Sequence, residues 1–340
     1  MGIVFIRRRA QPAEATVGIM QVLRHVDRSS SIRCPVMTVG NFDGVHLGHR
    51  ALLRKVIEDA QSRGGASVVL TFDPHPLKIV APAIAPRMLL ARRDKMGLLR
   101  DVGIDFTIIQ KFTPSFCDLA AEEFVQRYVT GLGTQSLWVG RDFRFGKGRT
   151  GTVEELRAWG PQSGFEVKII EEVMKANRRV SSSRIRDLIE TGDVNAVQRY
   201  LGRYHFIVGR VVRGQQRGRE LGFPTANLLS RSEVMPPDGI YATFVELGGQ
   251  HFPSVTSVGW NPTFGDGPRT IETHILGFDA NIYGRRLRLF FLDRIRDEKK
   301  FSSVELLVGQ IRQDVIDAQS VFHRADMEEL SMLDKEVRFT

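Results

Sequence analysis

The stretch VMTVGNFDGVHLGH, residues 36–49, decides the fold of the first half of the chain. Its first four residues form a β-rich run that leads into a glycine-containing turn. Apolar residues then recur at near-helical spacing over residues 47–60, and Gly64 and Gly65 end that predicted helix. A strand, a turn and a helix in this order predict the first unit of a parallel sheet.

Strand and helix patterns continue to alternate along the first half of the chain. We predict strands at residues 67–72, 106–109, 137–140 and 167–170, and a helix at residues 120–128. Such alternation favours a parallel sheet with helices on both faces. In sheets of this kind, ligands bind beyond the carboxyl ends of the strands.

Near residue 200 the pattern changes to short strand-like runs separated by Gly, Pro and Asp. The runs cover residues 205–212, 240–247, 252–258, 270–276 and 287–292. This spacing is typical of a small antiparallel barrel. A final amphipathic helix is predicted, with one apolar face formed by Leu306, Leu307, Ile311 and Val315. The boundary between two domains is expected within residues 190–204.

The composition sets limits on the class of protein. The 340 residues are 42% hydrophobic and 26% charged, which is average for a globular chain and enough for two packed domains. Cys34 and Cys117 form no C-x-x-C pair, which excludes a zinc ribbon or redox motif and favours a reducing, cytoplasmic compartment. No run of 18 apolar residues could span a membrane. Residues 1–19 are expected to form a loose extension.

The net charge of +9 indicates attraction to polyanions such as nucleic acid, nucleotides or pyrophosphate, without choosing among them.

The turn after the first strand lies where a doubly wound sheet binds phosphate. Two histidines three residues apart, His46 and His49, stand at the start of the helix and could donate hydrogen bonds to charge developing at phosphorus. Such a pair is equally often a surface or capping feature, and zinc lacks a third ligand here. The nucleotide-binding candidates in this turn are Gly40, Asn41, Phe42, Asp43 and Gly48.

Three further segments follow predicted strands, at residues 71–76, 139–146 and 180–186, so all could face one crevice. Hydroxyls and arginines at a helix start suit a polyphosphate. The candidates from these segments are Asp142, Phe143, Ser181, Ser182, Ser183, Arg184 and Arg186.

A second candidate site begins with a loop rich in Gly and Arg that joins the first two strands of the barrel. Thr225 and Asn227 are two residues apart, so they share one face of a strand and offer oxygen ligands of the kind that Mg²⁺ takes beside phosphates. Glu272 alternates with apolar residues on a later strand and could accept the proton of an attacking hydroxyl, or simply face solvent. The loop candidates are Arg217, Gly218, Arg219, Gly222 and Pro224.

Both sets of motifs carry a family resemblance. GNFDGVHLGH (40–49), TFDPHP (71–76), VGRDFRFG (139–146) and SSSRIR (181–186) resemble the FMN adenylyltransferase module of bacterial FAD synthetases, with Ser183 where threonine is usual. RGRELGFPTANL (217–228), PPDGIYA (236–242), VGWNPTFG (258–265), IETHIL (271–276) and IYGRRLRLFFLDRIRDEKKF (282–301) resemble the riboflavin kinase module, with Trp260 where Gly or Thr is common. The order is that of the bifunctional riboflavin kinase/FAD synthetase family.

The resemblance implies a Rossmann-like nucleotidyltransferase domain at residues 20–190 and a six-stranded barrel with a terminal helix at residues 204–325. It implies that ATP and Mg²⁺ convert riboflavin to FMN, and that ATP converts FMN to FAD and pyrophosphate. It assigns Thr225 and Asn227 to Mg-nucleotide and Glu272 to the base. The expected catalytic groups are therefore Glu272 at this site and His46, His49 and Arg184 at the other.

Two other interpretations stay open at this point. The first domain could transfer a nucleotidyl group to another phosphate ester, which the flavin-type barrel motifs disfavour. The chain could instead bind nucleic acid, or sense flavin without catalysis, but no helix-turn-helix, RNP or zinc-finger pattern supports this. We therefore expect small-molecule substrates, with no nucleic acid or membrane as partner, and leave the oligomeric state undecided.

Overall fold

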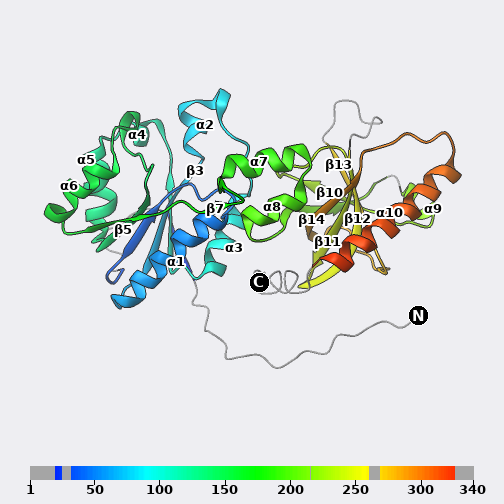
Figure 1. The fold of residues 1–340 in the computed structure, drawn as a ribbon, viewed down its shortest axis with the longest axis horizontal. Coiled ribbons are helices and arrows are strands. Elements are labelled where there is room, and N and C mark those ends of the chain that lie inside the picture. The colour runs from blue at the N-terminus through cyan, green and yellow to red at the C-terminus, as the bar shows by residue number, and fades with distance from the viewer. Residues whose placement is uncertain (1–19, 25–31, 215, 260–268, 326–340) are drawn as a thin grey trace.

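The computed structural model describes residues 20–24, 32–214, 216–259 and 269–325. The expectations for residues 1–19 and for Trp260 lie outside the described residues. Along the described chain a parallel sheet is followed by two helices and then by a barrel (Figure 1). No helix in these described ranges is both long and apolar enough to cross a bilayer.

The first half holds a six-stranded parallel sheet in the order β1-β4-β3-β2-β5-β6. The strands are β1 (Gln21–Leu23), β2 (Val36–Val39), β3 (Ser67–Asp73), β4 (Phe106–Lys111), β5 (Ser136–Gly140) and β6 (Glu166–Ile170). The five predicted strands are confirmed within two residues at each end, and the order reverses between β2 and β5. The short edge strand β1, which pairs with β4, was not predicted.

Helices cover both faces of this sheet because successive strand residues point to opposite sides. Val36 and Val69 pack against Leu53 and Leu99 on one face, whereas Met37 and its neighbours pack against the other layer. The first layer contains α1 (Leu47–Ser62) and α3 (Arg92–Val102), and the chain between β3 and α3 also forms α2 (Pro76–Val80) and η1 (Pro82–Ile84). The return from β4 to β6 contains α4 (Pro114–Cys117), α5 (Ala121–Phe124), η2 (Val125–Val129), η3 (Thr130–Leu132), η4 (Lys147–Arg149) and α6 (Val153–Ser163).

Two helices connect the sheet to the barrel and lie between them (Figure 1). After the hairpin of β7 (Met174–Lys175) and β8 (Arg178–Arg179), the chain forms α7 (Ser182–Thr191) and α8 (Val194–Leu201). Their buried residues Ile185 and Val197 share one cluster with Leu89 from the sheet side and Val234 from the barrel side.

The second half is a closed antiparallel barrel in the order β10-β13-β12-β11-β14-β9. Its elements are β9 (His205–Val212), α9 (Arg217–Glu220), β10 (Ala226–Ser230), β11 (Gly239–Leu247), β12 (Gln250–Gly259), β13 (Thr270–Ile275), β14 (Arg286–Arg296) and α10 (Val304–Arg324). Five strands match the predicted runs, and β10 supplies the sixth. The interior is filled by alternate residues such as Tyr241, Val245 and Phe291.

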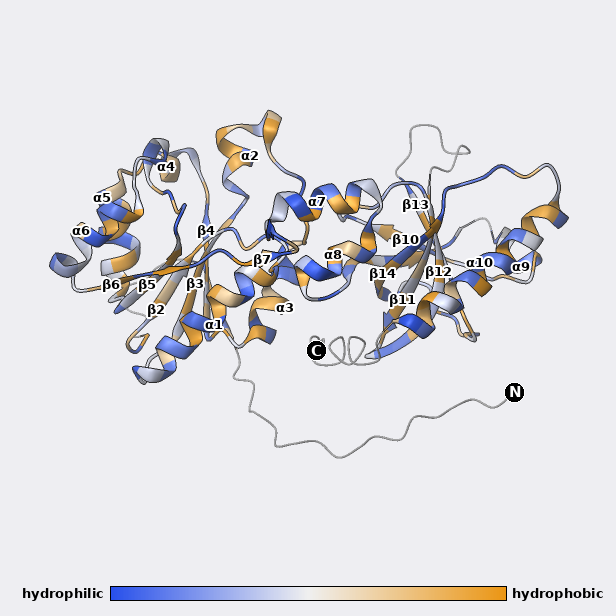
Figure 2. Ribbon diagram, viewed as in Figure 1, coloured by the Kyte–Doolittle hydropathy of each residue, from blue (hydrophilic) through white to orange (hydrophobic). Residues whose placement is uncertain are grey.

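The terminal helix α10 corrects one expectation. Leu306 is 57% exposed and does not belong to the buried face. The helix packs on the barrel through Val315 and Ala318, against Ala242 and Val255. Leu306 lies on a different side of the helix from Val315 and Ala318, because successive residues in a helix are rotated by about 100°. Helices α1, α7 and α10 each carry both hydrophobic and hydrophilic residues (Figure 2).

The sheet half and the barrel half of the chain share one buried hydrophobic cluster. Barrel residues Phe206, Phe244 and Phe290 belong to the same buried cluster as Leu53 of α1 and Leu99 of α3. The outer faces of β9, β11 and β14 therefore pack against the helices that cover one side of the sheet. This packing brings barrel side chains close to the loops at the carboxyl end of that sheet.

Candidate functional sites

The loop between β2 and α1 places two imidazoles at the head of α1. His46 is the N-cap residue, and its Nδ1 accepts a hydrogen bond from the backbone N–H of His49 at 3.2 Å. The two rings stack with centroids 3.6 Å apart and an angle of 12° between their planes. His46 thus does cap the helix, but it is 6% exposed and paired with a second imidazole, which a surface cap does not require.

Burial and nearby cations keep both histidines neutral. Burial above all, and then Arg203 and Arg179, lower the pKa of His46 to about 4, against a backbone hydrogen bond that raises it. Burial, His46 and Lys95 together hold the pKa of His49 well below its usual value. Because Nδ1 of neutral His46 accepts a hydrogen bond, its proton resides on Nε2, which can donate.

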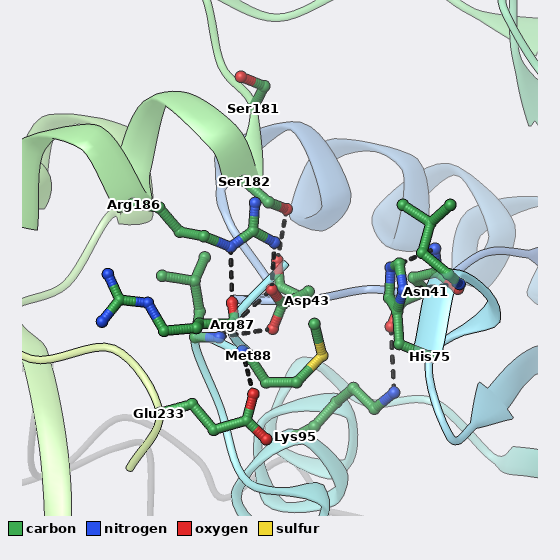
Figure 3. A network of polar contacts seen from close by, with 12 residues as sticks. Asn41, Asp43, His75, Arg87, Met88, Lys95, Ser181, Ser182, Arg186 and Glu233 are labelled. Atoms are coloured by element: carbon green, nitrogen blue, oxygen red, sulfur yellow. Dashed lines mark hydrogen bonds and ion pairs between the residues drawn. The ribbon is translucent and has the colours of Figure 1, made fainter. Parts of the chain in front are cut away.

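Asp43 anchors the start of α7 beside this loop (Figure 3). Its Oδ2 pairs with Arg186 Nη2 at 2.7 Å, and its Oδ1 accepts a hydrogen bond from the N–H of Leu89 at 3.0 Å. Ser182 Oγ donates to the carbonyl oxygen of Asp43 at 2.8 Å. Arg186 Nε also donates to the carbonyl of Arg87 at 2.7 Å. These predicted residues come together, but Arg186 and Ser182 bind protein atoms.

Asn41 belongs to a second group around the end of β3. Its Nδ2 lies 3.1 Å from His75 Nε2, and its carbonyl oxygen accepts a hydrogen bond from Lys95 Nζ at 3.0 Å. Lys95 also donates to Thr71 Oγ1 at 3.1 Å, and burial lowers its pKa. The sequence reasoning missed Lys95, since a single lysine in a polar helix carries no signal of a site.

A cavity of about 210 Å³ opens beside these residues. Asn41, Asp43 and Lys95 line it from the sheet side, and Arg231, Ser232 and Glu233 line it from the barrel side. Glu233 accepts a hydrogen bond from the N–H of Met88 at 2.8 Å (Figure 3). It also pairs with Lys78 at 2.6 Å. The barrel therefore forms part of the wall of this site.

Three buried polar atoms at the site have no hydrogen-bond partner within the described residues: Asn41 Oδ1, His49 Nδ1 and Arg184 Nε. Buried polar groups are normally satisfied, and an unsatisfied group calls for an explanation. Asn41 and His49 come from residues 40–49, and Arg184 comes from residues 180–186, one of the three further segments that the sequence predicted to face one crevice.

The other predicted residues of this site have separate roles. Ser181 caps α7 by accepting from the N–H of Arg184 at 3.3 Å, and the Ser183 side chain is exposed. Asp142 pairs with Arg179 at 2.7 Å, and Phe143 stacks on Phe145. Two glycines make room for rings, because a Cβ would lie 3.2 Å from the Phe42 ring at Gly40 and 3.2 Å from the His46 ring at Gly48.

The second site lies on the outer face of the barrel, where β10 and β13 pair. Asn227 stands directly opposite Glu272 in this pairing, and Thr225 Oγ1 donates to Glu272 Oε2 at 3.5 Å. On β13 the residues Ile271, Thr273 and Ile275 are buried, so Glu272 and His274 face outward. The structure therefore brings together the three residues that the sequence assigned to metal and base.

The loop before β10 packs closely against these side chains. A Cβ at Gly214 would collide with the Asn227 amide, and one at Gly218 would lie 3.3 Å from Thr225 Oγ1. His274 Nδ1 lies 2.8 Å from the carbonyl oxygen of Pro224 and fixes the end of the loop. Gly222 has a φ of +85°, Arg219 is exposed, and the side chain of Arg217 is outside the described part.

The donor set at this second site fits a hard cation. No group of three or more His, Cys, Asp or Glu residues in the described ranges could hold a metal. Thr225 and Asn227 offer a hydroxyl and an amide oxygen, and Mg²⁺ takes few protein ligands when phosphates complete its coordination. The pair fits a Mg²⁺ ion that arrives with a nucleotide, and it does not fit a zinc site.

Two family models match the chain: FAD synthetase over residues 29–184 and riboflavin kinase over residues 201–322. A bifunctional riboflavin kinase/FMN adenylyltransferase from Pseudomonas fluorescens is 39% identical and covers 84% of this chain and 92% of its own. The protein of the same name from Escherichia coli (strain K12) is 36% identical with the same coverage. A solved Streptococcus pneumoniae chain described as a macrolide-efflux protein matches with a TM-score of 0.80 at 31% identity, covering 88% of this chain and 99% of that one.

Proposed function

Because the chain belongs to the bifunctional riboflavin kinase/FMN adenylyltransferase family, we propose which of its residues carry each of the two reactions. The chain phosphorylates riboflavin to FMN with ATP, and it transfers an adenylyl group from ATP to FMN to give FAD and pyrophosphate. We place adenylyl transfer in residues 20–190 and riboflavin phosphorylation in residues 204–325. ATP and the flavins are the substrates, and Mg²⁺ is the cation that we assign.

In adenylyl transfer, a phosphate oxygen of FMN attacks the α-phosphorus of ATP. The bond from that phosphorus to the bridging oxygen breaks, and pyrophosphate leaves. Negative charge grows on the oxygens around phosphorus during this step. Neutral His46 donates to that charge through Nε2–H, and His49 lies stacked against it. A neutral imidazole at a helix N-terminus is a known electrophilic catalyst.

Arg184 is the cation that we assign to the phosphates of ATP. It lies in the first turn of α7, where backbone N–H groups favour anions, and its buried Nε has no hydrogen-bond partner within the described residues. Arg186 instead keeps the loop in place through its ion pair with Asp43. The unpartnered buried atoms of Asn41, His49 and Arg184 are the observation that carries this assignment.

In riboflavin phosphorylation, the 5′-hydroxyl oxygen attacks the γ-phosphorus of ATP and ADP leaves. The hydroxyl proton passes to Glu272, whose carboxylate faces outward from β13. Thr225 and Asn227 would hold Mg²⁺, which neutralises phosphate charge when bound. The Thr225 hydroxyl touches Glu272 at 3.5 Å, so metal ligand and base occupy one small surface.

The Arg184 assignment is tested with Arg184→Gln and a matched control, Arg54→Gln, which removes an exposed arginine of α1. A hydrogen bond to a charged group contributes about 1.5–3 kcal/mol. The KM for ATP in FAD synthesis should therefore rise about 10- to 100-fold in Arg184→Gln and stay unchanged in the control. An unchanged KM in both variants would remove Arg184 from the nucleotide site.

A further inference from the structure

The Arg203 side chain extends from the kinase half of the chain, residues 201–322, to the loop between β2 and α1 that we assign to adenylyl transfer. It lies between α8 and β9, within the residues that match the riboflavin kinase model. Its guanidinium is buried, and Nη2 donates to the carbonyl oxygen of Gly44 at 2.8 Å. Nη1 lies 3.5 Å from the carbonyl oxygen of Val45. One side chain therefore holds two consecutive carbonyls of the loop that ends at His46.

The backbone of this loop is strained, so contacts from outside the loop are needed to stabilise its conformation. Phe42 and Val45 have φ values of +49° and +40°, in the left-handed region that side chains with a Cβ rarely adopt. The conformation is least favourable for a β-branched residue such as Val45, and it persists only where the surroundings fix it. The carbonyls of Gly44 and Val45 are directed at Arg203, so the guanidinium supplies such a constraint.

The packing of the barrel against α1 fixes the position of Arg203. Gly202, with a φ of +68°, lies so close to Leu47 that a Cβ would collide with its side chain. The Arg203 guanidinium also lies 5.6 Å from the centre of the Phe206 ring on β9. Phe206 in turn packs on Phe290 of β14. The position of Arg203 is thus set by the barrel wall.

Arg203 also shapes the electrostatics of the residue that follows Val45. The pKa of His46 is lowered to about 4 by burial first and by Arg203 second. Arg179 from β8 contributes to this lowered value, a backbone hydrogen bond opposes it, and the stacked His49 ring faces His46 from α1. Loss of the Arg203 charge should therefore raise the pKa of His46, while burial and Arg179 continue to lower it.

We propose that Arg203 is a positioning residue through which the kinase half of the chain shapes the adenylyl-transfer site. The proposal rests on the proposed role of His46, since Arg203 acts on the reaction by holding the loop that carries this histidine. It means that FAD synthesis depends on a residue outside the stretch that matches the FAD synthetase model.

The test uses the full chain with Arg203→Met and Arg203→Lys. In Arg203→Met both the hold on the loop and the charge are lost. FAD synthesis from supplied FMN should fall about 10- to 100-fold, as expected for displaced catalytic groups. The fall of kcat/KM at acidic pH, which we call the acid limb, reports protonation of the free enzyme. It should move to higher pH, because the pKa of His46 should rise. Arg203→Lys keeps the charge and loses the two-pronged grip, so its rate should fall while its acid limb stays in place.

Riboflavin phosphorylation by the same preparations is the internal control and should stay within about twofold of wild type. A matched control is Glu246→Gln/Arg288→Met, which removes another buried guanidinium that stacks on Phe206, together with its partner at 2.8 Å. This control variant should synthesise FAD at the wild-type rate, and the acid limb of its kcat/KM should lie at the same pH as in wild type. A loss of both activities together in Arg203→Met, or no loss of either, would overturn the proposal.

His46→Asn separates this proposal from the one on which it rests. If His46→Asn makes FAD at the wild-type rate, the assigned role of His46 fails. If His46→Asn is impaired and Arg203→Met is not, the catalytic assignment stands and the proposal for Arg203 fails alone.

Discussion

The role of His46 in the adenylyl-transfer site is tested most directly by comparing two variants, His46→Ala and His46→Asn. His46 has an observed capping role and a proposed catalytic role, and the two roles use different ring atoms. Its Nδ1 caps α1 by accepting from the N–H of His49. Its Nε2 carries the proton that we propose is donated to the substrate. Alanine removes both functions. Asparagine is a good N-cap residue, but its side chain is too short to place a donor where Nε2 lies.

The two roles differ in the size of the effect expected when each is lost. Loss of an N-cap costs about 1 kcal/mol of stability, which lowers Tm by only a few degrees in a protein of this size. Loss of a preorganised donor to transition-state charge costs about 10²- to 10³-fold in rate. We therefore expect both variants to lose FAD synthesis to this extent, and only His46→Ala to lose stability as well.

The assay follows conversion of supplied FMN and ATP to FAD at saturating substrates, with thermal unfolding measured on the same samples. Riboflavin phosphorylation should continue in both variants, because that site lies on the barrel. If His46→Asn keeps the wild-type rate of FAD synthesis, the cap is the only function of His46 and the reasoning is refuted.

Three further outcomes are expected. Glu272→Gln should lower the rate of riboflavin phosphorylation about 10²- to 10⁴-fold with little change in substrate binding, as for a lost general base, and a near wild-type rate at saturating MgATP would place the base elsewhere. Gly214→Ala should displace the Asn227 amide and raise the Mg²⁺ concentration needed for the kinase alone; an unchanged Mg²⁺ titration would argue against a ligand at this position. The free energy of unfolding in urea should decrease as the pH falls from about 6.5 toward 4. In the folded chain the pKa values of His46 and His205 are lowered to about 4 and about 3, so both stay neutral over most of this range. In the unfolded chain both histidines bind protons near pH 6.5, which favours unfolding. The double variant His46→Asn/His205→Phe should show a shallower loss of stability over this range, and an equal loss would mean that these histidines do not govern it.

Local patterns were sufficient to predict most of the fold. The strand at residues 36–39 and the helix that follows the turn have strong periodicity, and β2 and α1 begin at the predicted residues. The edge strand β1 has only three residues, too few for a pattern, and forms by pairing with β4. Leu306 was placed on the wrong face because its neighbours are also apolar, and only the packing of α10 on the barrel separates them.

The candidate sites were predictable only where motif residues lie in the same segment. The register of β10 and β13 placed Asn227 opposite Glu272, which follows from pairing that the sequence alone does not define. Lys95 and Arg203 have no motif, because a cation in a helix or connector resembles a solvated surface residue until tertiary packing buries it. Arg186 illustrates the converse, since a predicted phosphate ligand is held by Asp43.

The central claim is that one chain carries two separate catalytic sites, and separation of flavins after incubation with riboflavin, ATP and Mg²⁺ tests it most directly. Wild type should convert riboflavin to FMN and then to FAD. His46→Asn should accumulate FMN, whereas Glu272→Gln should leave riboflavin unchanged and still convert supplied FMN to FAD. If one substitution abolishes both steps in a folded chain, or if either variant shows the wild-type product pattern, the assignment of two separate sites is contradicted.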